Sequence, residues 1–460
     1  MGASVDRSGA PPARHRARAG LAAALLLQFA LIACSGTPAA TPSPTGVAIA
    51  AATATPTSGG IVTAVADATV AVAPTRATPA ARSPAASSAR AVPPAGPPGP
   101  VTLRVPASAR DAALTQTRTL TVPGGFHVAV FAAGLPSARL LAWSPEGDLV
   151  VTQTLADDGK VVILPDRDRD GAADRAVVFA AGLRRPHGLV FHGGYLYVAE
   201  EARVVRFAWR GGQPAAGGPE VVVRDLPAGA GHSTRTLGFG PDGKLYVSIG
   251  SSCNVCAEKD PRRATIMQYN ADGSGGRVYA KGLRNAVDFT WRPGTNELWA
   301  TNNGRDNLGD NLPPETIDLV RDGDDFGWPY CHNGHIPDPQ FARLGTCDRV
   351  TRPAVEMQAH SAPLGLAFYD GAAFPADYQG DLLVAFHGSW NRATPTGYKV
   401  VRVRFQDGRP TGQVEDFVTG WLQPDGRAWG RPVAPLLAPD GSVYLTDDTL
   451  GVIYRITYGP

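Results

Sequence analysis

The segment Gly240-Pro-Asp-Gly-Lys-Leu-Tyr-Val is a turn followed by a short hydrophobic strand, and five other segments of this 460-residue chain repeat the pattern. The first apolar strand residues of successive copies are 47, 49, 53, 84 and 61 residues apart. A spacing of about 50 residues is typical of β-propeller blades. The six copies therefore predict an all-β fold, a six-bladed β-propeller. The other copies are Ser144-Pro-Glu-Gly-Asp-Leu-Val-Val, Phe191-His-Gly-Gly-Tyr-Leu-Tyr-Val, Pro293-Gly-Thr-Asn-Glu-Leu-Trp-Ala, Tyr378-Gln-Gly-Asp-Leu-Leu-Val-Ala and Ala438-Pro-Asp-Gly-Ser-Val-Tyr-Leu.

Further short apolar runs flank each copy and supply the remaining strands of a blade. Gly188-Leu-Val-Phe precedes one copy, and Arg203-Val-Val-Arg-Phe follows it. Three or four strands joined by tight turns make one antiparallel blade. The 84-residue gap predicts an insertion around residues 302–360. Because the inner strands of a propeller converge on its axis, we expect a ligand site at the loop end of that axis.

Composition and charge agree with this fold class and exclude one class of partner. The chain has 53 Gly and 41 Pro but only 18% charged residues, which favours many short strands and turns over long helices. The formal net charge is +2, and the N-terminal arginines account for it, so the rest of the chain is close to neutral. We therefore expect no nucleic-acid partner.

The N-terminal segment has the pattern of an export signal. Arg14, Arg16 and Arg18 precede the apolar run 20–33, which is too short to span a bilayer. The run ends in Leu31-Ile32-Ala33-Cys34, which resembles the lipobox of bacterial lipoproteins. We predict a signal peptide over residues 1–34 with lipidation at Cys34, the alternative being an ordinary secretory signal. The protein is then extracytoplasmic and held to a bacterial membrane through its lipid anchor alone.

The segment that follows the signal differs in composition from the rest of the chain. Residues 35–118 consist mostly of Ala, Thr, Ser and Pro, and aromatic residues are absent between 35 and 125. Such a segment cannot bury enough apolar surface to offset its chain entropy. We predict a flexible linker over 35–118 and a propeller domain over 119–460.

Several motifs in blade order carry a family resemblance over essentially all of residues 120–460. They resemble the soluble quinoprotein glucose/sorbosone dehydrogenases. The resemblance implies a six-bladed propeller that binds pyrroloquinoline quinone (PQQ) and Ca²⁺ and oxidises the anomeric carbon of an aldose. The motifs are the run from His232-Ser-Thr-Arg-Thr to Val247-Ser-Ile-Gly, Gly282-Leu-Arg-Asn, Asn303-Gly-Arg, Phe326-Gly-Trp-Pro, Gly388-Ser-Trp-Asn-Arg and Gly430-Arg-Pro-Val.

The resemblance places the general base at His232. Oxidising a hemiacetal by hydride transfer requires a base on the hydroxyl group, and a neutral histidine suits this role. In characterised relatives an Asp after the Ile-Gly pair supports the histidine, whereas here Ser251 follows Ile249-Gly250. The imidazole is then expected to be a weaker base.

Arginine side chains are the expected partners of the cofactor, which carries three carboxylates that planar guanidinium groups can bind bidentately. Arg284 and Asn285 match the Arg-Asn pair that the family places beside the quinone. Arg431 matches a cofactor-contacting arginine of the last blade. Lys399 lies in the fifth blade, which supplies a lysine in relatives.

A calcium site is expected at Gly304 and Arg305. The family binds this ion through the backbone carbonyls of a Gly-Pro dipeptide, and a carbonyl ligand does not depend on the side chain. The family's acidic pair appears here as Glu315-Thr316, so part of a loop metal site is missing. Separately, Asp166-Arg-Asp-Arg-Asp-Gly-Ala-Ala-Asp174 begins like a calcium loop but has Val177 at the position of the bidentate glutamate. It is either a solvated turn or a structural calcium loop.

The remaining cysteines are expected to form disulfides because the chain is exported. The spacing favours Cys253–Cys256 and Cys331–Cys347, although three pairings are possible. Zinc binding is the alternative, while haem attachment fails because Ala257 follows the Cys-x-x-Cys segment.

These observations lead to one preferred function and two alternatives. We predict PQQ-dependent oxidation of an aldose sugar or a sorbosone-like aldehyde, with His232 as base and with electrons passed to an external acceptor. The first alternative is a propeller lactonase, which would centre a metal on carboxylates at the axis. The second is a non-catalytic propeller that binds carbohydrate or protein.

Overall fold

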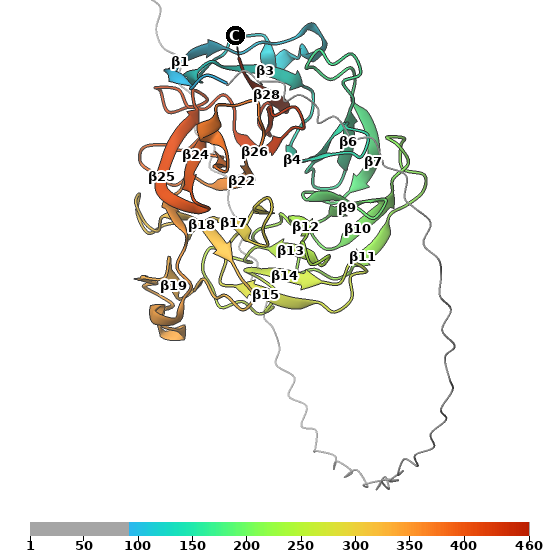
Figure 1. Cartoon of the computed structure of the whole chain (residues 1–460). Coiled ribbons are helices and arrows are strands. Elements are labelled where there is room, and N and C mark those ends of the chain that lie inside the picture. The colour runs from blue at the N-terminus through green and yellow to red at the C-terminus, as the bar shows by residue number, and fades with distance from the viewer. Residues whose placement is uncertain (1–91, 460) are drawn as a thin grey trace, which may run out of the picture. The chain divides into compact units, whose positions relative to one another are not determined.

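The structure, a computed structural model, describes residues 92–459, which form six four-stranded antiparallel blades around a central axis (Figure 1). The predicted six-bladed β-propeller is confirmed. The first blade consists of β4 (Ala138–Trp143), β5 (Leu149–Gln153), β6 (Gly159–Leu164) and β7 (Val177–Leu183). The second consists of β8 (Leu189–His192), β9 (Tyr195–Ala199), β10 (Val204–Ala208) and β11 (Glu220–Val223). The third consists of β12 (Leu237–Phe239), β13 (Leu245–Ile249), β14 (Thr265–Tyr269) and β15 (Arg277–Lys281).

The other three blades follow the same order from the axis outward, with one exchange of strands at the end of the chain. The fourth blade consists of β16 (Phe289–Trp291), β17 (Leu298–Asn302), β18 (Glu315–Val320) and β21 (Val355–Met357). The fifth consists of β22 (Pro363–Phe368), β23 (Leu382–Phe386), β24 (Lys399–Gln406) and β25 (Arg409–Val418). The sixth consists of β26 (Pro432–Leu437), β27 (Val443–Asp447) and β28 (Val452–Tyr458), with β3 (Phe126–Ala132) as its outermost strand.

The repeated sequence segment joins the first strand of each blade to the second. A glycine conformation that recurs within the chain explains the repeated turn: Gly243 and Gly441 have φ angles of +70° and +80°, which residues with a Cβ rarely adopt. The strand after each turn is buried along its whole length in most blades, as in β13 and β27. The sequence repeat therefore corresponds to the inner hairpin of each blade.

The ring is closed by strands from the two ends of the propeller. β28, near the C-terminus, pairs antiparallel with β3, with Arg455 opposite Ala129 and Tyr458 opposite Phe126. Figure 1 shows the blue-green β3 beside the dark red β28. This pairing joins the first and last segments of the propeller into one sheet.

Threonine hydroxyl groups connect neighbouring blades close to the axis. In each case a hydroxyl of a second strand donates to a backbone carbonyl of the next blade's innermost segment. The bonds, all 2.7 Å long, run from Thr152 to His187, from Thr301 to Leu364 and from Thr446 to Arg139. They hold the inner strands in register where the ligand site is formed.

The N-terminal part of the described chain corrects the predicted domain boundary. Residues 96–118, assigned above to the linker, are folded: β1 (Gly96–Thr102) pairs with β2 (Thr119–Gly124), and two 3-10 helices, η1 (Ala107–Ala109) and η2 (Ala112–Leu114), connect them. Leu103 and Leu114 are buried in the same hydrophobic cluster as Trp421. Composition alone predicts a linker because this segment has few apolar residues to pack against one another. In the structure these apolar residues pack against the blades instead.

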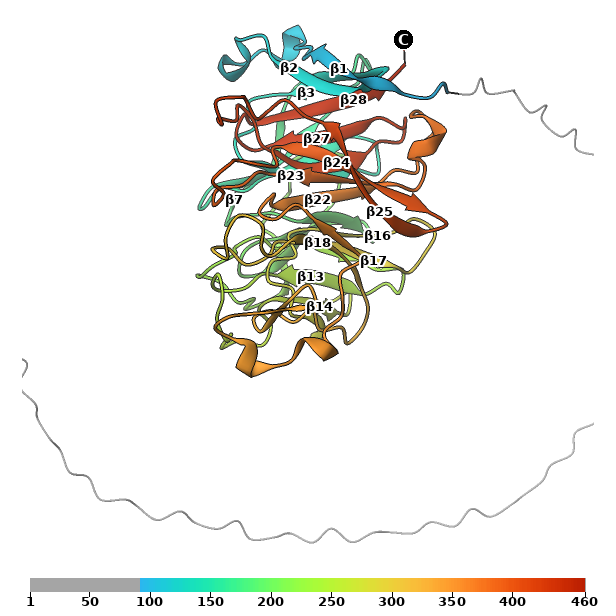
Figure 2. The ribbon, with the colours of Figure 1, turned by 90° about the vertical axis from the view of Figure 1, so that its left-hand side faces the viewer.

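The insertion lies within the fourth blade, between β18 and β21, and projects at the periphery of the ring (Figure 1). It contains the short pair β19 (Cys331–His332) and β20 (Ile336–Pro337), followed by η3 (Ala342–Leu344) and η4 (Cys347–Arg349). A further 3-10 helix, η5 (Ala376–Tyr378), lies in the fifth blade, and Figure 2 shows the blades from the side. The disulfide Cys331–Cys347 closes the insertion, as predicted.

Residues 1–91 lie outside the described part of the chain, and so do the predicted signal peptide, Cys34 and most of the predicted linker. Among residues 92–459, no helix has the length and apolar character needed to cross a membrane.

We expect a chain that begins at residue 119 to be less stable than one that begins at residue 92. Removing residues 92–118 leaves β2 without its partner strand and uncovers the cluster around Trp421. Loss of two buried leucines alone predicts a decrease of about 3 kcal/mol or more in the free energy of unfolding. Urea unfolding of both chains measures the difference, and equal midpoints would show that residues 92–118 add nothing to the fold.

Candidate active site

A cavity of about 340 Å³ lies where segments of the blades converge at one end of the axis. Polar and charged residues line most of it, and they come from segments between blades and between the strands of a blade. The lining includes Arg139, His232, Arg284, Asn285, Asn303, Gly304, Asp306, Glu315, His360, His387, Trp390, Asn391 and Arg431. The predicted residues His232, Arg284, Asn285, Gly304 and Arg431 are thus brought together from distant parts of the sequence.

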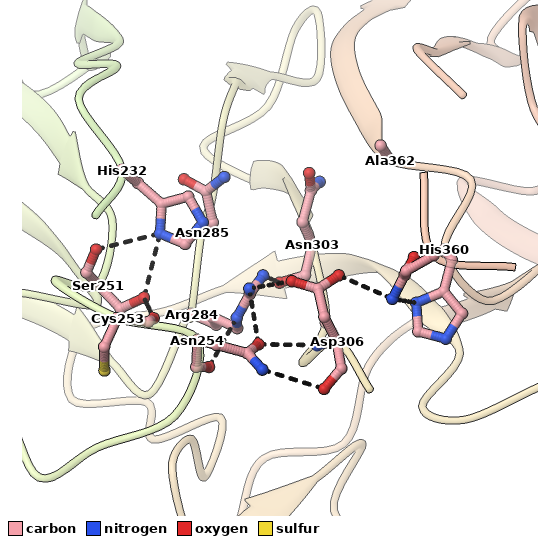
Figure 3. A network of polar contacts seen from close by, with 12 residues as sticks. His232, Ser251, Cys253, Asn254, Arg284, Asn285, Asn303, Asp306, His360 and Ala362 are labelled. Carbon is pink, nitrogen blue, oxygen red and sulfur yellow. Dashed lines mark hydrogen bonds and ion pairs between the residues drawn. The ribbon is translucent and has the colours of Figure 1, made fainter. Parts of the chain in front are cut away.

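His232 lies in the segment before β12, and its hydrogen bonds determine its tautomer. Its Nδ1 lies 3.1 Å from both the backbone carbonyl oxygen and the Oγ of Ser251 (Figure 3). Since a carbonyl oxygen only accepts hydrogen bonds, Nδ1 carries the proton and Nε2 keeps its lone pair. The Ser251 carbonyl thereby orients the ring, the role expected of an aspartate in relatives.

The electrostatic surroundings keep His232 neutral. Burial and the nearby Arg284 lower its pKa to about 3, and Arg235 and Arg263 act in the same direction. Arg235 is fully buried and donates to the His232 carbonyl oxygen at 2.9 Å. The imidazole is therefore unprotonated at neutral pH, and its proton affinity is lower than that of a free histidine.

Arg284 lies between β15 and β16 and is held by the loop after β17 and by the loop after β13. Its Nη2 is 2.7 Å from Asp306 Oδ2, and its Nη1 donates to the Asn303 carbonyl oxygen at 3.2 Å. The neighbouring Asn285 is buried, and its backbone N–H donates to Asn302 Oδ1. Both members of the predicted Arg-Asn pair line the cavity.

On the opposite blades, Arg431 and Arg139 add two further cations. Arg431 donates from Nε to the His387 carbonyl oxygen at 3.0 Å and from Nη2 to that of Gly388 at 3.1 Å. Arg139 forms a 2.9 Å ion pair with Asp448, which also lies 2.9 Å from Nε2 of His387. The Nε of Arg139 is buried and has no partner among residues 92–459.

Lys399 is not among the residues that line this cavity. Its ammonium group pairs with Asp416 on the neighbouring strand β25. The fifth blade contributes Trp390 and Asn391 to the cavity instead.

The predicted calcium dipeptide is split between two environments. Gly304 lines the cavity, and its N–H donates to Glu315 Oε2 at 2.6 Å. The Arg305 side chain turns away and forms a buried ion pair with Asp338, which also accepts from His332. Within residues 92–459, the carbonyl oxygens of Gly304 and Arg305 accept no hydrogen bond. Cation binding by this dipeptide stays a prediction, since Gly304 lines the cavity but Arg305 is not among its lining residues.

Glu315 is the third group near this dipeptide, and the pKa of its carboxyl group is raised. Burial raises its pKa to about 7, although the Gly304 N–H and Arg284 oppose the shift. The group therefore changes charge near neutral pH, and a bound cation would favour its ionised form.

Several cavity residues were not predicted from the sequence. His387 directly precedes the Gly388-Ser-Trp-Asn-Arg motif, so the motif could have indicated it. Trp390 belongs to that motif and is 72% exposed. Arg139 belongs to none of the motifs, and only the closure of the ring brings it to the cavity, where it pairs with Asp448 behind the lining.

The other predictions concern the cysteines and the acidic loop. The disulfide Cys253–Cys256 is present as predicted, so neither sulfur is free to bind zinc. Asp166, Asp168 and Asp174 have carboxylate oxygens within 4.8 Å of one another in the turn between β6 and β7. Calcium binding by this turn stays a prediction.

Comparison with known proteins assigns the whole propeller to one family model. Residues 120–459 match the family described as TrAA12-like. A Borreliella burgdorferi protein described as uncharacterized is 37% identical over 220 residues, which cover 47% of this chain and 57% of that protein. The pyrroloquinoline quinone-dependent pyranose dehydrogenase of Coprinopsis cinerea is 24% identical over 407 residues, covering 73% of this chain and 54% of that protein. This chain thus spans little more than half the length of these curated relatives.

Solved structures show the same fold. The PQQ domain of the Coprinopsis cinerea pyranose dehydrogenase in its holo form superposes with a TM-score of 0.66 at 23% identity, covering 77% of this chain and 100% of that domain. The PQQ-bound aldose sugar dehydrogenase of Streptomyces coelicolor gives a TM-score of 0.54 at 21% identity, covering 73% of this chain and 99% of that protein. At these identities the similarity shows a shared propeller fold.

We expect the buried Arg305–Asp338 ion pair to contribute far more to the free energy of unfolding than the exposed Lys399–Asp416 pair. Asp338→Asn leaves the buried Arg305 guanidinium without its carboxylate, which predicts a loss of about 3 kcal/mol or more in the free energy of unfolding. Asp416→Asn removes an exposed partner of Lys399 and predicts a loss below about 1 kcal/mol. Urea unfolding measures both, and equal effects would contradict the placement of Arg305.

Proposed function

Because the chain belongs to the TrAA12-like family, we propose that it is a PQQ-dependent dehydrogenase that oxidises a pyranose or a sorbosone-like aldehyde. The observation that carries this proposal is the arrangement of His232, whose pKa is lowered, and three arginines around a single cavity on the axis. Hydride transfer to an anionic cofactor requires a base that accepts the substrate's proton and cationic side chains that bind the cofactor.

The residues present fit PQQ. The cofactor carries three carboxylates, and Arg139, Arg284 and Arg431 all line the cavity. The unpartnered Nε of Arg139 is a donor that a carboxylate would satisfy. The backbone carbonyl oxygens of Gly304 and Arg305 would be the ligands of a Ca²⁺ ion, because they accept no hydrogen bond within residues 92–459. When bound, PQQ supplies a two-electron hydride acceptor.

The protein's own residues supply the proton transfer and the binding of the sugar. His232 Nε2 accepts the proton of the anomeric hydroxyl group while hydride leaves the carbon, so that no unstable cation forms. Asn285, buried and in the cavity lining next to Arg284, would contact the cofactor with its side-chain amide. The exposed indole of Trp390 offers an apolar face to a sugar ring.

The lactonase alternative finds less support in the cavity. Its metal would need several unpaired carboxylates, but Asp306 pairs with Arg284, and Asp448 pairs with Arg139 and His387. Glu315 accepts from two backbone N–H groups. For the dehydrogenase, a separate acceptor would have to take up the two electrons, and the Cys34 lipobox supports a lipid-anchored, extracytoplasmic location.

The test is dye reduction with a panel of pyranoses and sorbosone-like aldehydes, with and without PQQ and Ca²⁺, and with a chelator as control. Activity that requires both additions supports the proposal. A protein that shows no change in PQQ absorbance or fluorescence on mixing would instead be a binding propeller.

We expect His232→Gln to lower turnover at least about 100-fold while leaving PQQ affinity unchanged, because the base is lost but the arginine cradle stays. For the unaltered protein, kcat/KM is expected to fall only at a pH well below 6.5, since the active form of His232 is the neutral one and its pKa is lowered. Steady-state kinetics across pH measure this. Near-normal turnover of His232→Gln would remove His232 from the mechanism.

We expect Arg431→Ala to weaken PQQ binding about 10-fold or more, because a charge-assisted contact to a carboxylate is lost. Lys399→Ala serves as the matched control, since its ammonium group pairs with Asp416 outside the cavity lining. Fluorescence titration with PQQ compares the two. Equal affinities in both variants would show that Arg431 does not contact the cofactor.

A further inference from the structure

The disulfide Cys253–Cys256 closes a small ring in the loop after β13, and Cys253 of this loop lies near His232 and Arg284 in Figure 3. The ring lies between β13, which ends at Ile249, and β14, which begins at Thr265, in a segment with no regular secondary structure. Backbone order in such a segment has an entropic cost that a covalent crosslink reduces. The crosslink is placed where the loop meets the active-site cavity.

Asn254 lies inside this ring, and both its side chain and its carbonyl oxygen contact cavity residues. Its carbonyl oxygen accepts from Arg284 Nε at 3.0 Å, and its Oδ1 accepts from Arg284 Nη2 at 3.0 Å. Two donors of one guanidinium group are therefore oriented by a single residue. The same carbonyl oxygen also accepts from Trp328 Nε1 of the fourth-blade insertion at 3.3 Å.

The same side chain also binds the loop that follows β17. Asn254 Oδ1 accepts from the backbone N–H of Asp306 at 2.8 Å, and its Nδ2 donates to the Asp306 carbonyl oxygen at 3.1 Å. Asp306 in turn pairs with Arg284 and accepts from Asn391 of the fifth blade. Asn254 thus joins loops of the third and fourth blades directly, and Asp306 extends the network to the fifth (Figure 3).

The ring reaches His232 as well. Ser251 Oγ donates to the Cys253 carbonyl oxygen at 2.6 Å, and the Ser251 carbonyl oxygen accepts the Nδ1 proton of His232. On its outer side the loop is held by Glu258, which accepts from the Ser252 N–H and Oγ, each at 2.6 Å. One ordered loop therefore sets the direction of both the base and the arginine.

We propose that Asn254, held by the Cys253–Cys256 ring, is a positioning residue that orients Arg284 and the Asp306 loop for cofactor binding. This proposal rests on the proposed function only for the identity of the cofactor. The geometric part concerns the protein alone: opening the ring or truncating Asn254 frees the backbone N–H of Asp306 and the Arg284 guanidinium.

Hydrogen–deuterium exchange of the cofactor-free protein tests the geometric part. In Asn254→Ala, the backbone N–H of Asp306 loses its acceptor. In the double variant Cys253→Ser/Cys256→Ser, the acceptor remains, but the disulfide no longer holds it in place. Exchange in peptides that cover 303–310 is therefore expected to be at least about 10-fold faster. Asn296→Ala, which alters an exposed turn residue of the fourth blade, serves as the matched control in which this exchange stays unchanged.

PQQ titration by fluorescence tests the cofactor part with the same variants. We expect about a 10-fold weaker affinity for Asn254→Ala and for the ring-opened variant, and a smaller loss for Asn254→Asp, which keeps the Oδ acceptor for Asp306 and Arg284. The Asn254→Ala protein keeps the disulfide, so it decides the question even where the ring-opened variant does not fold.

The outcomes separate the two proposals. Unchanged exchange and unchanged affinity in Asn254→Ala would overturn the positioning role. Faster exchange with unchanged affinity would also overturn it, because Arg284 would then not need this support. If the unaltered protein binds no PQQ, the proposed function fails, while the exchange measurement still shows whether Asn254 holds the Asp306 loop.

Discussion

The pairing of β28 with β3 is the constraint on which the rest of the structure depends. Each blade by itself is a small sheet with two faces to bury, and it buries them against its neighbours only if the ring is complete. Once the ring is closed, segments that are more than 300 residues apart meet at the axis, as the 2.7 Å bond from Thr446 to the Arg139 carbonyl oxygen shows. The cavity exists because of this closure, since its lining comes from separate blades and no single blade could enclose it.

A second constraint is electrostatic. The cavity brings Arg139, Arg284 and Arg431 into one space, where their mutual repulsion and their burial have to be offset. Carboxylates and backbone carbonyls provide that offset on one side of each guanidinium group. The same concentration of positive charge keeps His232 neutral, so one arrangement of cations serves both the binding of an anionic cofactor and the state of the base. Arg284 connects the two roles because it contacts the Asp306 loop and also lowers the pKa of His232.

Residues that carry a local sequence pattern were the predictable ones. The blade repeat predicted all six inner hairpins, and cysteine spacing predicted both disulfides. Arg284 and Arg431, which belong to motifs, line the cavity, whereas Lys399, which belongs to none of the quoted motifs, pairs with Asp416 instead. Residues 96–118 were misassigned because composition measures how much a segment could bury by itself, and Leu103 is buried by another part of the chain.

The sequence by itself determined the number of blades, the position of their turns and the residue types available for chemistry. These follow from short-range physics: a turn glycine with positive φ and a strand of alternating or continuous apolar residues act within a few residues of each other. Only the tertiary structure decided which charged groups face one another. Arg139 and Asp448 belong to no motif, Asn254 acts through loops of other blades, and the Ser251 carbonyl takes the place of an expected carboxylate. Hydrogen bonds and ion pairs act only over a few ångströms, and ring closure alone brings these groups within that distance.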